Sequence, residues 1–210
     1  MLVAVMAVKR QRNPRGEGSR LKEEVLEAAM RLLDKIPATK LSLRMVATEA
    51  GVAPTSIYAH FPDAKAMITA VVEGCWAQLG VHMSEAAKNC DSQVAIDILK
   101  AQMAAYVAYA MEGSSRYQLL FAWHQILEDD ESGSRGLVKF AYRNVLATME
   151  KMVAEGIQLP ADDNISSTMM VLSLAHGRIA LALLSRQLPG NSTSSVQQFV
   201  SVSIDQIFRV

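Results

Sequence analysis

The segment SLRMVATEAGVAPTSIYAHFPDAKAMI, residues 42–68, gives the clearest indication of the fold. Ser42 is expected to begin a short helix, which Gly51 ends as a left-handed cap. A three-residue turn follows, and Pro54 pre-sets the first turn of another helix, expected to reach about His60. Two short helices joined by such a turn form a helix-turn-helix, whose second helix can enter the major groove of DNA. The bare pattern also occurs in many helical proteins that never bind DNA, where it reflects simple helical packing.

Side-chain placement in the second short helix favours the DNA interpretation. Ile57 and Phe61 can turn inward at helical spacing, which leaves a short, hydrogen-bonding face outside. That outward face comprises Thr55, Ser56, Tyr58, Ala59 and His60. Such side chains can contact phosphates and base edges without a stripe of lysines. An outward-facing tyrosine is not required on a helix face that only contacts water, so it favours a binding role.

The charge of the chain is unevenly distributed. The whole chain has a formal net charge of +0, but residues 1–65 carry 11 Lys and Arg against 7 Asp and Glu, whereas residues 66–210 carry 10 against 14. The first part therefore suits an anionic partner. Arg12 and Arg15, in a basic arm ahead of the first helix, are candidates for minor-groove contacts.

Length and composition indicate a folded chain with a small module joined to a larger body. The 210 residues are 50% hydrophobic and 20% charged, which argues against disorder. We expect a basic arm at 1–18, a helix-turn-helix domain at 19–65 and a ligand-binding and dimerisation domain at 66–210.

Helical periodicity continues through the rest of the chain, and no strand pattern competes with it. Apolar spacing, glycines and prolines predict about nine helices in an all-α fold. Besides the two short helices, the predicted ranges are 21–36, 63–88, 92–111, 115–127, 135–156, 165–187 and 192–208.

The opening residues MLVAVMAV do not form a signal peptide by pattern, because the basic cluster follows the apolar run and no small-residue cleavage site appears. No stretch is judged long and charge-free enough to cross a membrane. We therefore expect a cytoplasmic protein without a membrane partner. Cys75 and Cys90 are interpreted as small buried side chains.

Residues 42–68 resemble the DNA-binding signature of the TetR family of transcriptional regulators. The resemblance rests on Ser42, Leu43, Val46, Ala50-Gly51-Val52, Ile57-Tyr58, His60-Phe61 and Pro62-Asp63. It implies a bacterial homodimer that binds a pseudo-palindromic double-stranded DNA operator, represses transcription and is released by a small-molecule effector.

The same resemblance implies roles for individual residues. Ser42 and Arg44 would contact phosphates or groove edges from the first short helix. Pro54, Thr55, Ser56, Tyr58 and His60 would form the recognition surface, with Tyr58 the strongest candidate. Members of the family often carry Lys or Arg where this chain has Ala64, and Lys65 stands one position later.

The C-terminal part resembles one subclass of regulatory domain, which is named for Trp, His and Gly. The resemblance rests on AYVAYAMEGSSRYQLLF, residues 105–121, and on Ala175-His176-Gly177. The tryptophan expected shortly before His176 is missing, and Leu172 lies in that zone.

The last two predicted helices are apolar on more than one face, so each is expected to be buried on more than one face. Together they could form half of a four-helix dimer interface. The candidate interface residues are Met169, Leu174, His176, Gly177, Phe199 and Val200. His176 is interpreted as an interface or core residue.

A largely apolar ligand would bind among the middle helices. The candidates are Trp76, Met103, Tyr106, Phe121, Trp123, His124 and Met149. Aromatic and methionine side chains at helical spacing are also typical of ordinary core.

Two other function classes compete with a regulator. The four histidines are too widely spaced for a local metal motif, and no phosphate-binding glycine loop or nucleophile elbow occurs, so we expect no enzyme, no metal and no cofactor. The second alternative is a helical small-molecule-binding or interaction protein that has no DNA function.

Overall fold

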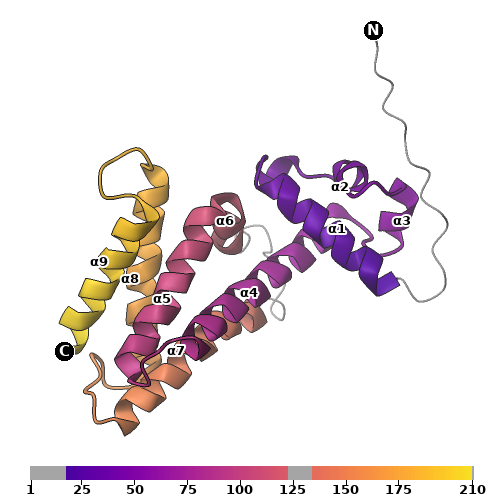
Figure 1. Cartoon of the computed structure of the whole chain (residues 1–210). Helices are drawn as coiled ribbons and strands as arrows, with labels where there is room; N and C mark the ends of the chain where they lie inside the picture. The colour runs from indigo at the N-terminus through magenta and orange to yellow at the C-terminus, as the bar shows by residue number, and fades with distance from the viewer. Residues whose placement is uncertain (1–17, 123–133, 210) are drawn as a thin grey trace. The chain divides into compact units, whose positions relative to one another are not determined.

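The computed structural model describes residues 18–122 and 134–209, and every regular element within them is helical. Within those ranges, nine α-helices and one short 3-10 helix follow one another along the chain (Figure 1). The all-α fold predicted from the sequence is therefore confirmed. The chain divides into two compact units, with the boundary between Val71 and Val72 inside one long helix.

The first unit is built from three helices, one 3-10 helix and the start of a fourth α-helix. They are α1 (Gly18–Leu33), η1 (Ala38–Lys40), α2 (Leu43–Ala50), α3 (Pro54–Tyr58) and the beginning of α4 (Ala64–Lys88). α1 packs against α2, and α2 packs against α3. Their fully buried side chains include Val25, Ala28, Ala29, Val46, Ile57 and Met67. This small core fixes the orientation of the two short helices.

Two predicted details at the ends of α1 are wrong. The helix begins at Gly18, three residues ahead of the predicted start at residue 21. At the other end the helix stops at Leu33, ahead of the expected stop at Pro37. The residue before a proline avoids helical backbone angles, and here the chain already leaves the helix through a turn in which the amides of Lys35 and Ile36 donate to the Leu32 carbonyl at 2.8 Å.

The second unit contains the rest of α4 and five further helices. They are α5 (Ala95–Glu112), α6 (Ser114–Ala122), α7 (Ser134–Ala154), α8 (Asn164–Leu184) and α9 (Thr193–Phe208). α5 packs against α6, α7, α8 and α9 (Figure 1). The ion pair between Lys100 and Asp205 and the bond from Gln197 Nε2 to the Ala104 carbonyl, 2.9 Å long, tie α5 to α9. α5 is therefore the central helix of this unit.

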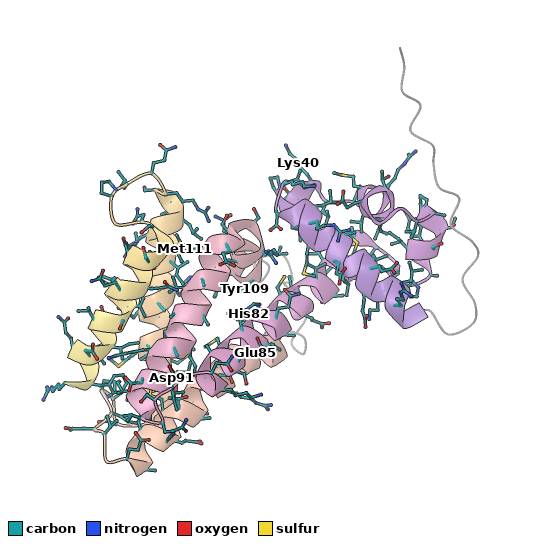
Figure 2. The ribbon with its side chains drawn as sticks, viewed as in Figure 1. Lys40, His82, Glu85, Asp91, Tyr109 and Met111 are labelled. Atoms are coloured by element: carbon teal, nitrogen blue, oxygen red, sulfur yellow. The ribbon has the colours of Figure 1, made fainter. Side chains whose placement is uncertain are left out.

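Tyr109 joins α5 to α4. Its hydroxyl donates to the Cys75 carbonyl at 3.0 Å, and its ring centroid lies 5.6 Å from that of His82 (Figure 2). Since Cys75 is itself fully buried, this bond lies in the interior, where an unpaired hydroxyl would be costly. The contact fixes the part of α4 that follows Val72 against α5.

α8 corrects one expectation from the sequence. By length and composition it is apolar enough to cross a membrane, and only a third of the qualifying stretch is buried inside the chain. The sequence expectation was wrong because Arg178 is the one Asp, Glu, Lys or Arg among the residues of this helix. Core helices of soluble proteins pass the same test of length and composition. The low buried fraction therefore indicates mainly that α8 has apolar side chains on the outside of its own chain.

Candidate nucleic-acid interface and ligand pocket

Local hydrogen bonds define both ends of α2. The Ser42 hydroxyl accepts from the Met45 amide at 3.3 Å and caps the start of the helix. At the other end Gly51 adopts a φ of 66°, and the amides of Gly51 and Val52 donate to the carbonyls of Thr48 and Ala47. This Schellman arrangement reverses the chain after α2, as the sequence predicts.

α3 starts at Pro54 and is shorter than predicted. Its regular part ends at Tyr58, and His60 lies in the turn that follows. The amides of His60 and Phe61 both donate to the Ile57 carbonyl at 2.9 Å, which tightens that turn. Ile57 and Phe61 are buried, as expected from their spacing.

The outward face of α3 carries most of the predicted recognition residues. Pro54, Thr55 and Tyr58 are exposed, and Ser56 and His60 are half-buried. The Tyr58 side chain is 58% exposed, although a tyrosine ring gains free energy by burial. The face therefore presents an aromatic ring and hydroxyl groups to whatever approaches the helix.

Positive charge flanks this face. Arg44 on α2 and Lys65 on α4 are exposed, and in the described part of the first unit neither has an acidic partner. Arg31 instead pairs with Glu49 at 3.2 Å, which links α1 to α2. Unpaired exposed cations are available to phosphate oxygens, whereas a paired arginine is already partly neutralised.

Four predicted site residues lie outside the described ranges. They are Arg12 and Arg15 of the basic arm, and Trp123 and His124 after α6.

The second unit contains a pocket of about 170 Å³. Its walls come from α4, α5, α6, α7 and α8, and the wall atoms are nearly all apolar. Trp76 and Phe121 form an edge-to-face pair, with centroids 5.6 Å apart and planes at 71°. The lining residues are Trp76, Tyr106, Phe121, Ala141, Tyr142, Met169, Leu172, Ser173 and His176. An apolar pocket with few polar groups is the common form of a small-molecule site.

A chain of three polar side chains runs along this pocket. The hydroxyls of Tyr106 and Tyr117 are 2.9 Å apart, and the Tyr117 hydroxyl lies 2.6 Å from His176 Nδ1. Burial raises the pKa of Tyr106, and it raises that of Tyr117, where the neighbouring Tyr106 adds to the effect. Burial lowers the pKa of His176 from 6.5. All three groups are therefore neutral at pH 7.

The structure brings some predicted ligand-binding residues to this pocket and leaves others out. Trp76, Tyr106 and Phe121 line it, whereas Met103 and Met149 are completely buried and do not. Helical spacing identifies a buried face but does not distinguish solid core from a cavity wall. His176, interpreted from the sequence as an interface or core residue, lines the pocket. Leu172, four residues before His176 on α8, lines the same pocket, but the sequence did not mark it as a pocket residue.

An apolar surface covers the outer side of α8 and α9. Eight of the thirteen exposed large hydrophobic side chains belong to these helices or the turn between them. We call Met170, Leu181, Leu184, Phe199 and Val202 the α8–α9 face.

The predicted interface residues are distributed unevenly around the α8–α9 face. Phe199 belongs to it, Gly177 is exposed beside it, and Met169 is about half exposed and also lines the pocket. Leu174 is half-buried. Val200 is 1% exposed inside its own chain, so it has no surface to offer a partner. Consecutive residues of a helix point in different directions, which separates Val200 from Phe199.

Family models match most of the chain. Residues 25–71 match the model described as "Bacterial regulatory proteins, tetR family", and residues 99–207 match "Tetracyclin repressor-like, C-terminal domain". No protein with a curated description matches the chain significantly.

Solved structures share the fold at low sequence identity. A Rhodococcus protein of unknown function is 22% identical, with a TM-score of 0.76 over 94% of this chain and 98% of the other. The TetR family transcriptional regulator PfmR from Thermus thermophilus is 17% identical, with a TM-score of 0.63 over 88% and 97%. The fatty acid degradation regulator FadR from Bacillus halodurans is 10% identical, with a TM-score of 0.68 over 91% and 97%. With both units matched by family models, this chain belongs to the TetR family of transcriptional regulators.

Proposed function

We propose that this protein is a cytoplasmic repressor that binds a pseudo-palindromic DNA operator as a homodimer and is released by a small, largely apolar ligand. The observation that carries the proposal is the outward face of α3. Tyr58 is 58% exposed there while its neighbour Ile57 is fully buried. A core that holds one face of a short helix and presents an aromatic, hydroxyl-rich face to solvent is suited to reading DNA.

Phosphate contacts would come from the flanks of that face. The exposed Arg44 and Lys65 are suitable donors. The Ser42 hydroxyl uses its oxygen to accept from Met45, so its hydrogen is available to a phosphate oxygen. Such contacts position the protein, whereas base contacts from Tyr58 and Thr55 would give sequence preference.

Dimerisation would use the α8–α9 face. Regulators of this family dimerise, and a two-fold pair reads two half-sites of a pseudo-palindrome. Leu181 and Leu184 are 64% and 81% exposed, which is unfavourable for an isolated chain. Gly177 lies on the same side of α8, and a Cβ there would meet no atom within 4 Å of its own chain. A partner helix can therefore approach closely.

Release would act through α4. This one helix contributes Met67 to the core of the first unit and Trp76 to the wall of the pocket. A ligand against Trp76 would favour one position of α4 and so change the population of the DNA-competent state. The shift is limited by the ligand's differential affinity for the two states, typically about 1–3 kcal/mol.

The test is a selection from a randomised DNA duplex pool with the purified full-length protein. We expect enrichment of an inverted repeat, and no enrichment with Tyr58→Ala. Circular dichroism and the oligomeric state of Tyr58→Ala should match the wild type, because the side chain is largely outside the core. Failure of the wild-type protein to enrich any sequence would overturn the proposal and favour a ligand-binding protein without DNA function.

A further inference from the structure

The pocket described above restricts the chemistry of its ligand more narrowly than "small and apolar". Its volume is about 170 Å³. An apolar cavity of roughly 150 Å³ in another protein holds one benzene molecule. Trp76 and Phe121 present an edge-to-face aromatic wall, and the Phe121 and His176 ring centroids are only 4.0 Å apart. The size and the flat aromatic walls fit a single ring with a short substituent.

Charge restricts the ligand further. None of the described residues that line the pocket is an Asp, Glu, Lys or Arg. Burial lowers the pKa of His176, so this side chain is no ready cation either. An isolated carboxylate or ammonium group loses much hydration free energy in such surroundings, with no partner to offset it. The pocket therefore favours a neutral molecule.

The chain of hydrogen bonds through Tyr106, Tyr117 and His176 determines which ring nitrogen of His176 carries the proton. If the Tyr106 hydroxyl donates to Tyr117 and the Tyr117 hydroxyl donates to His176 Nδ1, then every hydroxyl hydrogen has an acceptor. The proton of the neutral imidazole is then on Nε2. In the reverse direction the buried Tyr106 hydroxyl hydrogen has no acceptor among the described residues, which is unfavourable. The first direction is therefore preferred.

His176 Nε2 is the ring nitrogen left for the ligand. Nδ1 is used by Tyr117, and within the described ranges Nε2 makes no hydrogen bond although His176 lines the pocket. A donor with no partner in the chain is suited to an acceptor on a bound molecule.

We propose that the effector is a neutral single-ring compound with one hydrogen-bond-accepting carbonyl oxygen, which accepts from His176 Nε2. Tyr117 is a positioning residue, because its hydroxyl fixes the imidazole tautomer. The inference rests on the proposed function only in naming the ligand an effector. The binding chemistry is independent of DNA.

The test compares three probes of similar size by isothermal titration calorimetry with the full-length protein. They are acetophenone, which has the carbonyl, ethylbenzene, which lacks it, and benzoate, which carries a charge. We expect acetophenone to bind about tenfold more tightly than ethylbenzene, as one net hydrogen bond allows, and benzoate to bind more weakly than either. Equal affinities for acetophenone and ethylbenzene, the tightest binding by benzoate, or no binding by any probe would overturn the proposal.

Variants assign the contact. His176→Phe keeps a ring of similar shape and should abolish the preference for acetophenone while ethylbenzene still binds, which shows that the pocket is intact. Tyr117→Phe should reduce the preference, because Nδ1 loses the donor that keeps the proton on Nε2. Val153→Ala is the control, since Val153 is 52% exposed on α7 and does not line the pocket, so the preference should be unchanged. Retention of the preference in His176→Phe would refute the assignment.

A final titration separates this inference from the proposed function. Acetophenone is added to the complex of the protein with its selected DNA duplex. Weaker DNA binding in the presence of acetophenone would support both the proposed pocket chemistry and the proposed release from DNA. Carbonyl-dependent binding of acetophenone with unchanged DNA affinity would uphold the pocket chemistry and contradict release by this class of ligand.

Discussion

At the scale of single residues, the sequence is most informative where backbone geometry leaves little choice. Gly51 adopts a φ of 66°, and a Cβ placed on it would meet no atom within 4 Å. The requirement for glycine is therefore purely conformational, which is why the pattern Ala50-Gly51-Val52 predicts the turn. Pocket residues have no such local signal, because lining a cavity depends on neighbours from five helices.

Replacing Gly51 and Gly74 by alanine should change the free energy of unfolding in opposite directions. Gly51→Ala should lower the free energy of unfolding by about 1–2 kcal/mol, since the left-handed conformation strains an alanine. Gly74→Ala, in the interior of α4 and also without close neighbours, should raise it by about 0.5–1 kcal/mol. Urea denaturation measures both. Stabilisation by Gly51→Ala would contradict the assigned cap.

His176 gives a prediction about pH. Because burial lowers its pKa from 6.5 in the folded chain, the unfolded chain takes up the proton first as the pH falls. The contribution of His176 to stability is therefore fully present above pH 6.5 and is lost as the pH falls through the folded-state pKa. Urea denaturation at neutral and at mildly acidic pH should show a larger loss for the wild type than for His176→Phe. An equal loss in both proteins would argue against the buried neutral imidazole.

At the scale of elements, helix types and most helix boundaries could be predicted, because caps and apolar spacing are local. Asp63 illustrates this, since its Oδ1 accepts from the Ala66 amide at 2.7 Å at the start of α4. α3 ends earlier than its pattern predicts, in a turn where the His60 amide donates to the carbonyl of Ile57, three residues back. The sequence shows that α8 is apolar on more than one face. It does not show which of these faces packs against the core of its own chain.

Ser42 allows the structural role of a helix cap to be separated from a role in DNA binding. Ser42→Ala should lower the free energy of unfolding by about 1 kcal/mol, because the Met45 amide loses its partner. Ser42→Asp should retain the cap, since a carboxylate is an equally good acceptor at a helix start. The added negative charge should nevertheless weaken DNA binding in an anisotropy titration. Wild-type DNA affinity in Ser42→Asp would place Ser42 away from the phosphates.

At the scale of the whole molecule, the proposed function requires a second copy of the chain. The α8–α9 face lacks a cover, and its most exposed members belong to α8. The apolar periodicity of α8 and α9 predicts that these helices form part of a dimer interface. Val200 was wrongly assigned to the interface, because it is buried in its own chain, whereas His176 lines the pocket.

Leu181→Glu should therefore produce a monomer in sedimentation velocity, because a carboxylate would be buried in the apolar interface without a partner. Val153→Glu is the matched control, since Val153 is 52% exposed on α7 and is not part of the α8–α9 face. It should remain dimeric. A dimeric Leu181→Glu protein would move the interface elsewhere on the chain.

The outward face of α3 is proposed to bind DNA, and fluorescence anisotropy can test this claim. Fluorescence anisotropy of the selected duplex is followed with wild type, Tyr58→Ala and the remote control Val153→Ala at about 50 and 200 mM salt. We predict that Tyr58→Ala weakens binding by about 1–3 kcal/mol at both salt concentrations, whereas Val153→Ala leaves it unchanged. Identical affinities and salt dependence for wild type and Tyr58→Ala would contradict the claim.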